Sequence, residues 1–130
     1  MHEIGIVRQM LRTVETFAQE NEIREIHEVV VDCGELSLVI PEYVEELYPV
    51  VVKGSILEQT RLTVHVVPGL AECDDCDEIF NVVDHRGTCP NCGSFRKTVL
   101  SGKDFTIREI VVPEVAPEET ERKEDAYAKI

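Results

Sequence analysis

Four cysteines in two closely spaced pairs constrain this chain more than any other feature. Cys73 and Cys76 form one C-x-x-C pair, and Cys89 and Cys92 form a second pair after twelve intervening residues. Two such pairs can present four thiolates to one tetrahedral ion, which is the usual arrangement of a structural zinc site. Pro90 suits the tight turn inside the second pair. We therefore predict that these four cysteines bind one Zn(II) per chain.

The segment that carries the cysteines, residues 69–103, is too short and too polar to fold on apolar burial alone. Metal binding would supply its folding free energy, about 10–16 kcal/mol in comparable zinc peptides. Four protein ligands leave no open position for water, so the predicted site is structural and not catalytic. Two disulfides, a redox-active pair and an iron site are the alternatives that the spacing leaves open.

Apolar periodicity predicts the rest of the fold. Helical spacing favours one helix from residue 4 to about 20 and a second from Pro41 towards Gly54, with Pro49 expected to kink it. Alternation predicts three strands, at residues 26–33, 62–67 and 105–112, the last with a bulge. We expect an α+β fold: an about three-stranded antiparallel sheet with two helices, plus an inserted zinc-ribbon-like four-cysteine domain.

The expected domain division follows from shifts in composition along the chain. Residues 1–68 and 104–112 would form the α+β domain, and residues 69–103 the inserted zinc-binding domain. Residues 113–130 have many acidic residues and no apolar face, so we predict a disordered acidic tail. Cys33 has the period of a core residue, whereas His65 and His85 are expected to be exposed.

Charge excludes two classes of partner. The chain has 26 Asp and Glu against 13 Lys and Arg, a formal charge of −13, which opposes binding to nucleic acid or to an anionic membrane. No apolar run reaches the ~18 residues that a membrane span needs, and the N-terminus does not resemble a secretory signal. Five cysteines without an export signal indicate a reducing compartment, so we expect a cytoplasmic protein.

Enzymatic chemistry is not expected from the sequence. The chain contains no Ser/His/Asp constellation, no reactive cysteine arrangement and no Gly-rich phosphate loop. We therefore predict no catalytic residues, and any nucleotide hydrolysis that the function needs would come from a partner.

A second candidate metal site lies at the start of the chain. The α-amine of Met1, the deprotonated amide nitrogen of His2 and the His2 imidazole could form fused chelate rings, and such nitrogen donors suit Ni(II) or Cu(II). Glu3 or another group could fill the fourth position. Many chains begin with Met-His by chance, so this start predicts a metal site only together with other features.

Four short motifs in order supply those features. They are Met1-His2-Glu3, Gly34-Glu35-Leu36-Ser37, Lys53-Gly54-Ser55-Ile56-Leu57-Glu58, and the Cys73/Cys76…Cys89-Pro90-x-Cys92-Gly93-Ser94 segment. Over about residues 1–112, this combination strongly resembles the HypA/HybF family of hydrogenase-maturation nickel metallochaperones.

The resemblance implies a nickel-binding α+β domain with an inserted zinc domain. It places a Ni(II) site at the N-terminus around His2, with Met1 and Glu3 as members of the same motif, and it matches the four cysteines to the zinc ligands one for one. Nickel would be a transient cargo, handed to the nickel–iron hydrogenase large subunit together with a nickel-binding GTPase. Some members also serve urease, which implies urease accessory proteins as further partners.

Two other functions are compatible with a four-cysteine module. One is a zinc-ribbon adaptor in which His2 is incidental, and the other is a nucleic-acid or ribosome-associated module without nickel delivery. The second is disfavoured because Asp74 and Asp75 stand where phosphate-binding modules carry Lys or Arg.

Overall fold

Helix α1 (His2–Glu20) is the first element of the computed structural model, which describes residues 2–113 and 128–129. Its buried apolar side chains recur at helical spacing: Val7, Met10, Val14 and Ala18 are at most 2% exposed. This stripe confirms the first predicted helix, which begins two residues earlier than the apolar pattern indicated.

Helix α2 (Pro41–Val51) is the second predicted helix. Proline suits the first turn, where its missing N–H would have no acceptor in the helix. Val44 and Tyr48 are its buried side chains, and the helix continues through Pro49 before ending ahead of Gly54.

The larger sheet has the strand order β2-β1-β6-β7. Its strands are β1 (Glu28–Gly34), β2 (Arg61–Val67), β6 (Phe105–Val111) and β7 (Ala128–Lys129). Strand β1 is antiparallel to β6 but parallel to β2, so the prediction of an antiparallel sheet is wrong for that pair. The reason is α2, which lies between β1 and β2 in sequence and carries the chain back to start β2 in the same direction.

Two details at strand β6 bear on the predictions. The register against β1 shifts between Val30 and Val31, with Glu109 and Ile107 as their partners, so β6 contains the predicted bulge at Arg108. Strand β7 pairs with β6 on its other side, which the sequence pattern did not indicate. Of the predicted disordered tail, residues 113–130, the structure describes only Pro113 and the two residues of β7, and the other residues lie outside the described part of the chain.

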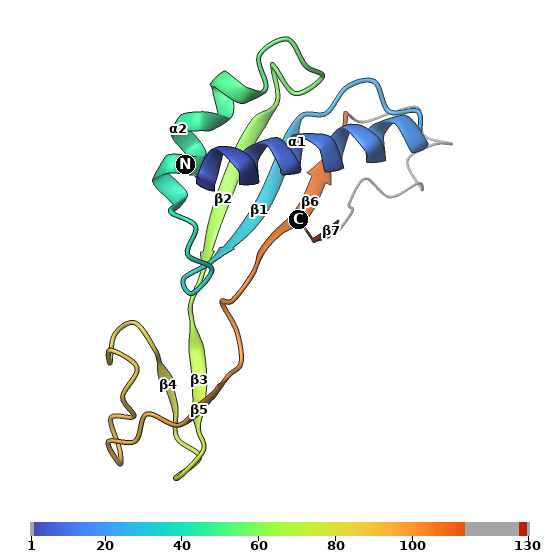
Figure 1. Ribbon diagram of the computed structural model, residues 1–130. Helices are drawn as coiled ribbons and strands as arrows, with labels where there is room; N and C mark the ends of the chain where they lie inside the picture. Colours follow the sequence, from blue (N-terminus) through green and yellow to red (C-terminus); the bar gives the residue numbers. More distant parts are fainter. Residues whose placement is uncertain (1, 114–127, 130) are drawn as a thin grey trace.

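Both helices cover the same face of the larger sheet (Figure 1). The strands direct Val29, Val31, Ile107 and Ile110 into this core, each at most 1% exposed. Cys33 is also buried there, as predicted. We call this layered part, formed by α1, α2 and the larger sheet, the body.

A second, smaller sheet contains three short strands in the order β4-β3-β5. These are β3 (Leu70–Cys73), β4 (Ile79–Asn81) and β5 (Lys97–Val99), and we call residues 70–99 the cysteine unit. Figure 1 shows this unit beyond the end of β2, joined to the body by an outgoing and a returning linker. The predicted α+β class with a four-cysteine insertion is confirmed, whereas the exact domain boundaries stay a prediction. No helix of the described residues is long and apolar enough to cross a bilayer.

Candidate metal centres

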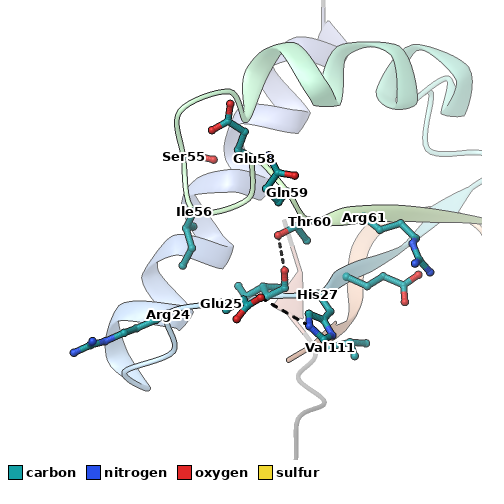
Figure 2. Close-up of a pocket in the computed structure, with 12 residues that line it drawn as sticks. Arg24, Glu25, His27, Ser55, Ile56, Glu58, Gln59, Thr60, Arg61 and Val111 are labelled. Atoms are coloured by element: carbon teal, nitrogen blue, oxygen red, sulfur yellow. Dashed lines mark hydrogen bonds and ion pairs between the residues drawn. The ribbon is translucent and has the colours of Figure 1, made fainter. Parts of the chain in front are cut away.

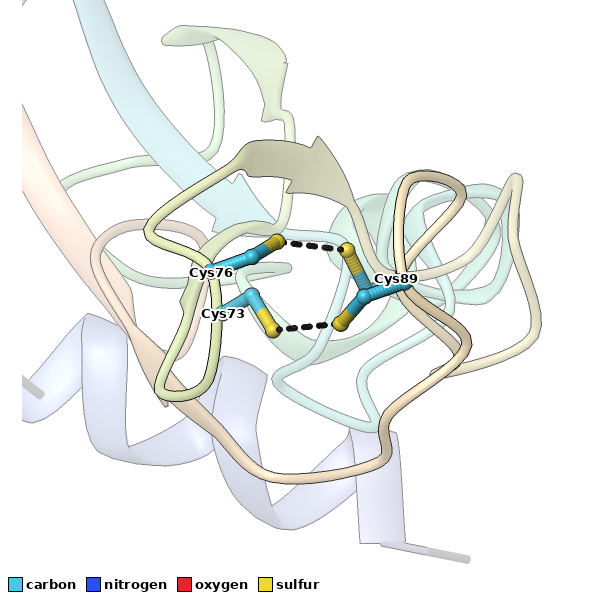
Figure 3. A group of neighbouring side chains, drawn as sticks. Cys73, Cys76 and Cys89 are labelled. Atoms are coloured by element: carbon cyan, nitrogen blue, oxygen red, sulfur yellow. Dashed lines mark hydrogen bonds between the residues drawn. The ribbon is translucent and has the colours of Figure 1, made fainter.

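The four cysteine sulfurs of the cysteine unit converge on one point, as Figure 3 shows for its three labelled residues. The four Sγ atoms all lie within 4.8 Å of one another, with 3.5 Å between Cys73 and Cys92 and 3.6 Å between Cys76 and Cys89. Sulfurs about 2.3 Å from a common tetrahedral ion would be about 3.8 Å apart. Disulfides need about 2.05 Å, so this geometry fits zinc and does not fit two disulfides.

Main-chain amides point at these sulfurs in both C-x-x-C turns. The Asp75 N–H donates to Cys73 Sγ and the Asn91 N–H to Cys89 Sγ, each at 3.4 Å. The Asn91 side-chain amide also donates to Cys76 Sγ at 3.3 Å. Such donors stabilise thiolates, which are the form of cysteine that binds zinc.

Two of these thiols, Cys76 and Cys92, have pKa values shifted in opposite directions. The Asn91 side chain and the Glu78 backbone lower the pKa of Cys76 to about 7. For Cys92 the Ser94 backbone lowers the pKa, but hydrogen bonding with Cys73, burial and the other thiols raise it to about 12. This divergence is expected of closely spaced groups that share protons. A divalent ion at the centre would displace those protons.

The acidic residues of the first turn have structural partners. Asp75 Oδ1 lies 3.0 Å from Arg96 Nη2, and its carboxylate also accepts a hydrogen bond from Ser94. Asp74 Oδ1 accepts one from Thr98 Oγ1 at 2.9 Å. Both carboxylates therefore connect the first C-x-x-C turn to the segment that follows the second turn.

The start of α1 places the second group of predicted metal ligands. The His2 side chain is 55% exposed, whereas that of Glu3 is 8% exposed. His2 Nδ1 lies 3.6 Å from Glu3 Oε2, and the same oxygen accepts a hydrogen bond from the Ile40 N–H at 3.2 Å. Met1 lies outside the described residues.

Glu3 therefore has a structural contact that the sequence did not reveal. Its carboxylate holds the chain at Ile40, directly before α2, and so connects the starts of the two helices. Burial raises the pKa of Glu3, but the Glu3 and Ile40 N–H groups and the adjacent His2 outweigh burial, so its pKa is below the usual value. No local pattern signals a partner 37 residues away.

A cavity of about 190 Å³ lies beside His2. Its walls come from α1, from the turn before α2, and from the returning linker at Lys103 and Asp104. The linker was not among the predicted site residues, because nothing in its sequence indicates proximity to the start of the chain.

A larger cavity, of about 890 Å³, lies elsewhere in the body (Figure 2). Arg24, His27, Glu58 and Arg61 are among its lining residues, and His27 Nε2 lies 4.0 Å from Glu25 Oε2. None of the predicted metal ligands that the structure describes lines this cavity, and it contributes no metal-binding cluster among the described residues.

Two histidines are exposed, as predicted. His65 lies on β2. His85 lies between the cysteine pairs, where its ring meets the edge of Phe80 at a centroid distance of 6.2 Å. Neither joins the four-sulfur cluster, which is the one group of three or more potential metal ligands found in the described part of the chain.

Comparison with known proteins gives one consistent match. The family model described as "Hydrogenase/urease nickel incorporation, metallochaperone, hypA" matches residues 1–112. The chain is 36% identical to hydrogenase maturation factor HypA of Geobacter sulfurreducens, covering 86% of this chain and 99% of that protein. It is 35% identical to the HypA of Francisella philomiragia, covering 85% and 98% respectively.

The fold comparison agrees with the family model. The solution structure of the Ni metallochaperone HypA from Helicobacter pylori matches with a TM-score of 0.61 at 22% identity, covering 87% of this chain and 98% of the other. The family model spans the start of α1, both linkers and the four-cysteine cluster. The chain therefore belongs to the HypA family of nickel metallochaperones, which act in hydrogenase and urease nickel incorporation and are not enzymes.

Proposed function

We propose that this chain binds Ni(II) at its N-terminus through Met1, His2 and Glu3 and delivers the ion for maturation of a nickel–iron hydrogenase. The observation that carries this proposal is the pairing of the exposed His2 imidazole with the Glu3 carboxylate, 3.6 Å apart, at the first turn of α1. An ion bound at His2 Nδ1 would have the Glu3 oxygen beside it, in reach of the fourth position.

The helix start supports this chelate in a second way. The first amides of a helix have no intrahelical acceptor, so deprotonating the His2 amide breaks no helical hydrogen bond. The positive end of a helix disfavours a bare cation. The deprotonated amide and the Glu3 carboxylate would supply the compensating negative charge.

Delivery requires that the ion can leave. The His2 side chain is more than half exposed, so a partner could reach a nickel ion bound to it. The proposed partners are the nickel-binding GTPase of hydrogenase maturation and the hydrogenase large subunit, with urease accessory proteins where urease is the client. A cytoplasmic location, where these partners would meet the chain, is part of the same proposal.

The cysteine unit has a separate role in this proposal. Cys73, Cys76, Cys89 and Cys92 would hold one zinc ion per chain, which stabilises residues 69–103 as an inserted domain. Four sulfur ligands close that site, so nickel would not exchange through it.

Calorimetric titration of Ni(II) into the zinc-loaded protein tests the nickel site. Wild type should bind one ion, and His2→Ala should bind at least about tenfold more weakly. One extra residue before Met1 should weaken binding similarly, because it moves the α-amine. His65→Ala, which removes an exposed histidine of β2, is the matched control. Unchanged stoichiometry and affinity in His2→Ala would show that the proposed site is wrong.

A further inference from the structure

The turn that follows β1 binds both linkers between the body and the cysteine unit. The Glu35 N–H donates to Val67 O at 2.9 Å, at the start of the outgoing linker. The Leu36 N–H donates to Gly102 O at 2.7 Å, and the Gly34 N–H to Asp104 O at 3.0 Å, both on the returning linker. One turn of the body therefore fixes two segments that are more than thirty residues apart in sequence.

These segments approach so closely that the backbone leaves no room for side chains. A Cβ atom added to Gly34 would lie 2.1 Å from Gly102 O, and one added to Gly102 would lie 2.6 Å from Pro68 O. A Cβ atom on Gly69 would lie 2.5 Å from Leu36 Cγ. Glycine permits this contact of backbone with backbone. We call the turn and the two linkers the linker junction.

The Glu35 side chain extends the junction into the cysteine unit. Its Oε1 atom accepts hydrogen bonds from the Gly69 N–H at 2.9 Å and from the Asn81 side-chain amide at 3.1 Å. Asn81 is the last residue of β4, and its Oδ1 accepts the Asp84 N–H at 2.9 Å, which fixes the orientation of its amide group. Glu35 thus connects the body directly to a strand of the cysteine unit.

The returning linker then leads to His2. Lys103 and Asp104 lie in the returning linker and form one wall of the cavity of about 190 Å³ beside His2. Ser37, two residues after Glu35, also lines this cavity. A change in the orientation of the cysteine unit on the body would therefore move one wall of the cavity beside His2, where nickel is proposed to bind.

We propose that Glu35 is a positioning residue: by bridging Gly69 and Asn81, it holds the cysteine unit in one orientation on the body. This orientation in turn keeps the returning linker beside His2, at the proposed nickel site. The part of this inference that concerns nickel rests on the proposed function. The part that concerns orientation does not.

Amide nitrogen-15 relaxation of the zinc-loaded full chain tests the orientation. Wild-type body and cysteine unit should share one rotational correlation time. In Glu35→Ala the cysteine unit should tumble faster than the body, and Asn81→Ala should give the same result. The double variant should add nothing to the effect of Glu35→Ala, because that change already removes the hydrogen bond between Glu35 and Asn81. Glu35→Gln should behave as wild type, since its amide oxygen can still accept both hydrogen bonds. Glu46→Ala, an exposed acidic residue of α2, is the matched control.

Nickel affinity tests the consequence. Glu35→Ala should weaken Ni(II) binding about tenfold, the lower end of the effect of residues that support metal ligands without binding the metal. Glu35→Gln should retain wild-type affinity for Ni(II). Equal correlation times in Glu35→Ala and wild type would overturn the proposal. Separate tumbling with unchanged nickel affinity would overturn the positioning role. If wild type binds no nickel through His2, the proposed function fails, and the relaxation comparison still decides whether Glu35 holds the two units.

Discussion

The body and the cysteine unit are stabilised in different ways. The core of the body buries sixteen residues drawn from both helices, from strands β1 and β6, and from the segments that connect these elements. The core of the cysteine unit buries four, Ala71, Cys73, Phe80 and Cys89, and two of these are predicted zinc ligands. Apolar burial can fold the first, whereas the second has too little apolar surface to offset the entropy of ordering its chain. We therefore expect the body to fold through its apolar residues and the cysteine unit to depend on a metal ion.

Zinc removal should separate the two regions most strongly. A chelator should unfold residues 70–99 and leave the body folded, because zinc supplies about 10–16 kcal/mol in comparable peptides. Amide spectra should show the cysteine-unit resonances collapsing to unfolded positions while those of α1 and β1 persist. Cys73→Ser should have the same effect, and Cys33→Ala, which changes a buried cysteine of the body, should retain zinc. Loss of the body signals together with zinc would contradict this comparison.

Truncating a core residue of the body should lower the stability of the body without releasing zinc from the cysteine unit. Met10 is fully buried on the inner face of α1, and Met10→Ala should cost about 2–5 kcal/mol of unfolding free energy. Urea unfolding of the zinc-loaded protein, followed by a body signal, measures the loss. The exposed Gln19→Ala on the same helix should change stability little. Zinc content should be unaltered in both variants, so zinc loss from folded Met10→Ala would show that the regions are not independent.

The linker junction belongs to neither hydrophobic core, so a substitution there tests the connection between the body and the cysteine unit. Gly102 and Gly54 both have φ of +81°, but a Cβ atom at Gly54 would meet nothing within 4 Å. Both alanine variants share the cost of a left-handed residue, about 1–2 kcal/mol. Gly102→Ala should cost more in thermal or urea unfolding, because its Cβ would also contact Pro68 O. Equal losses would mean that the junction can relax around the new side chain.

The smallest expected effect concerns a single hydroxyl in the body. Tyr48 donates to Thr60 O at 3.0 Å, and burial raises its pKa to about 12. Folding therefore favours the neutral phenol. The contribution of the neutral Tyr48 phenol to folding stability is complete below the unfolded pKa, about 10, and is lost as pH rises through the folded pKa. Tyr48→Phe should cost about 1 kcal/mol at neutral pH.

Absorbance titration of tyrosinate measures this shift. The transition near pH 12 should disappear in Tyr48→Phe and persist in Tyr43→Phe, which alters a half-exposed tyrosine of the same helix. Ionisation of the Tyr48 phenol at the unfolded value of about 10 would contradict the buried hydrogen bond.

Periodicity predicted the body well because its elements are long enough to show a repeat. The stripe from Val7 to Ala18 and the alternation in β1 both indicated their buried faces correctly. Alternation does not give strand direction, so the parallel pairing of β1 with β2 was missed. The helix between these strands was the available signal, since a parallel pair needs such a crossover.

The cysteine unit and the junction were harder to predict from the sequence. Strands of three or four residues are too short for a period to appear, although the cysteine spacing located the cluster correctly. The contacts of Glu3 with Ile40 and of Glu35 with Asn81 join distant parts of the chain through single polar atoms. Hydrophobic patterns carry no information about such contacts.

X-ray absorption at both metal edges of one nickel- and zinc-loaded sample tests the central claim most directly. The zinc edge should show four sulfur neighbours at about 2.3 Å, and the nickel edge should show nitrogen and oxygen donors with imidazole scattering that His2→Ala removes. Sulfur in the nickel shell, or imidazole scattering that persists in His2→Ala, would contradict the assignment of nickel to the body and zinc to the cysteine unit.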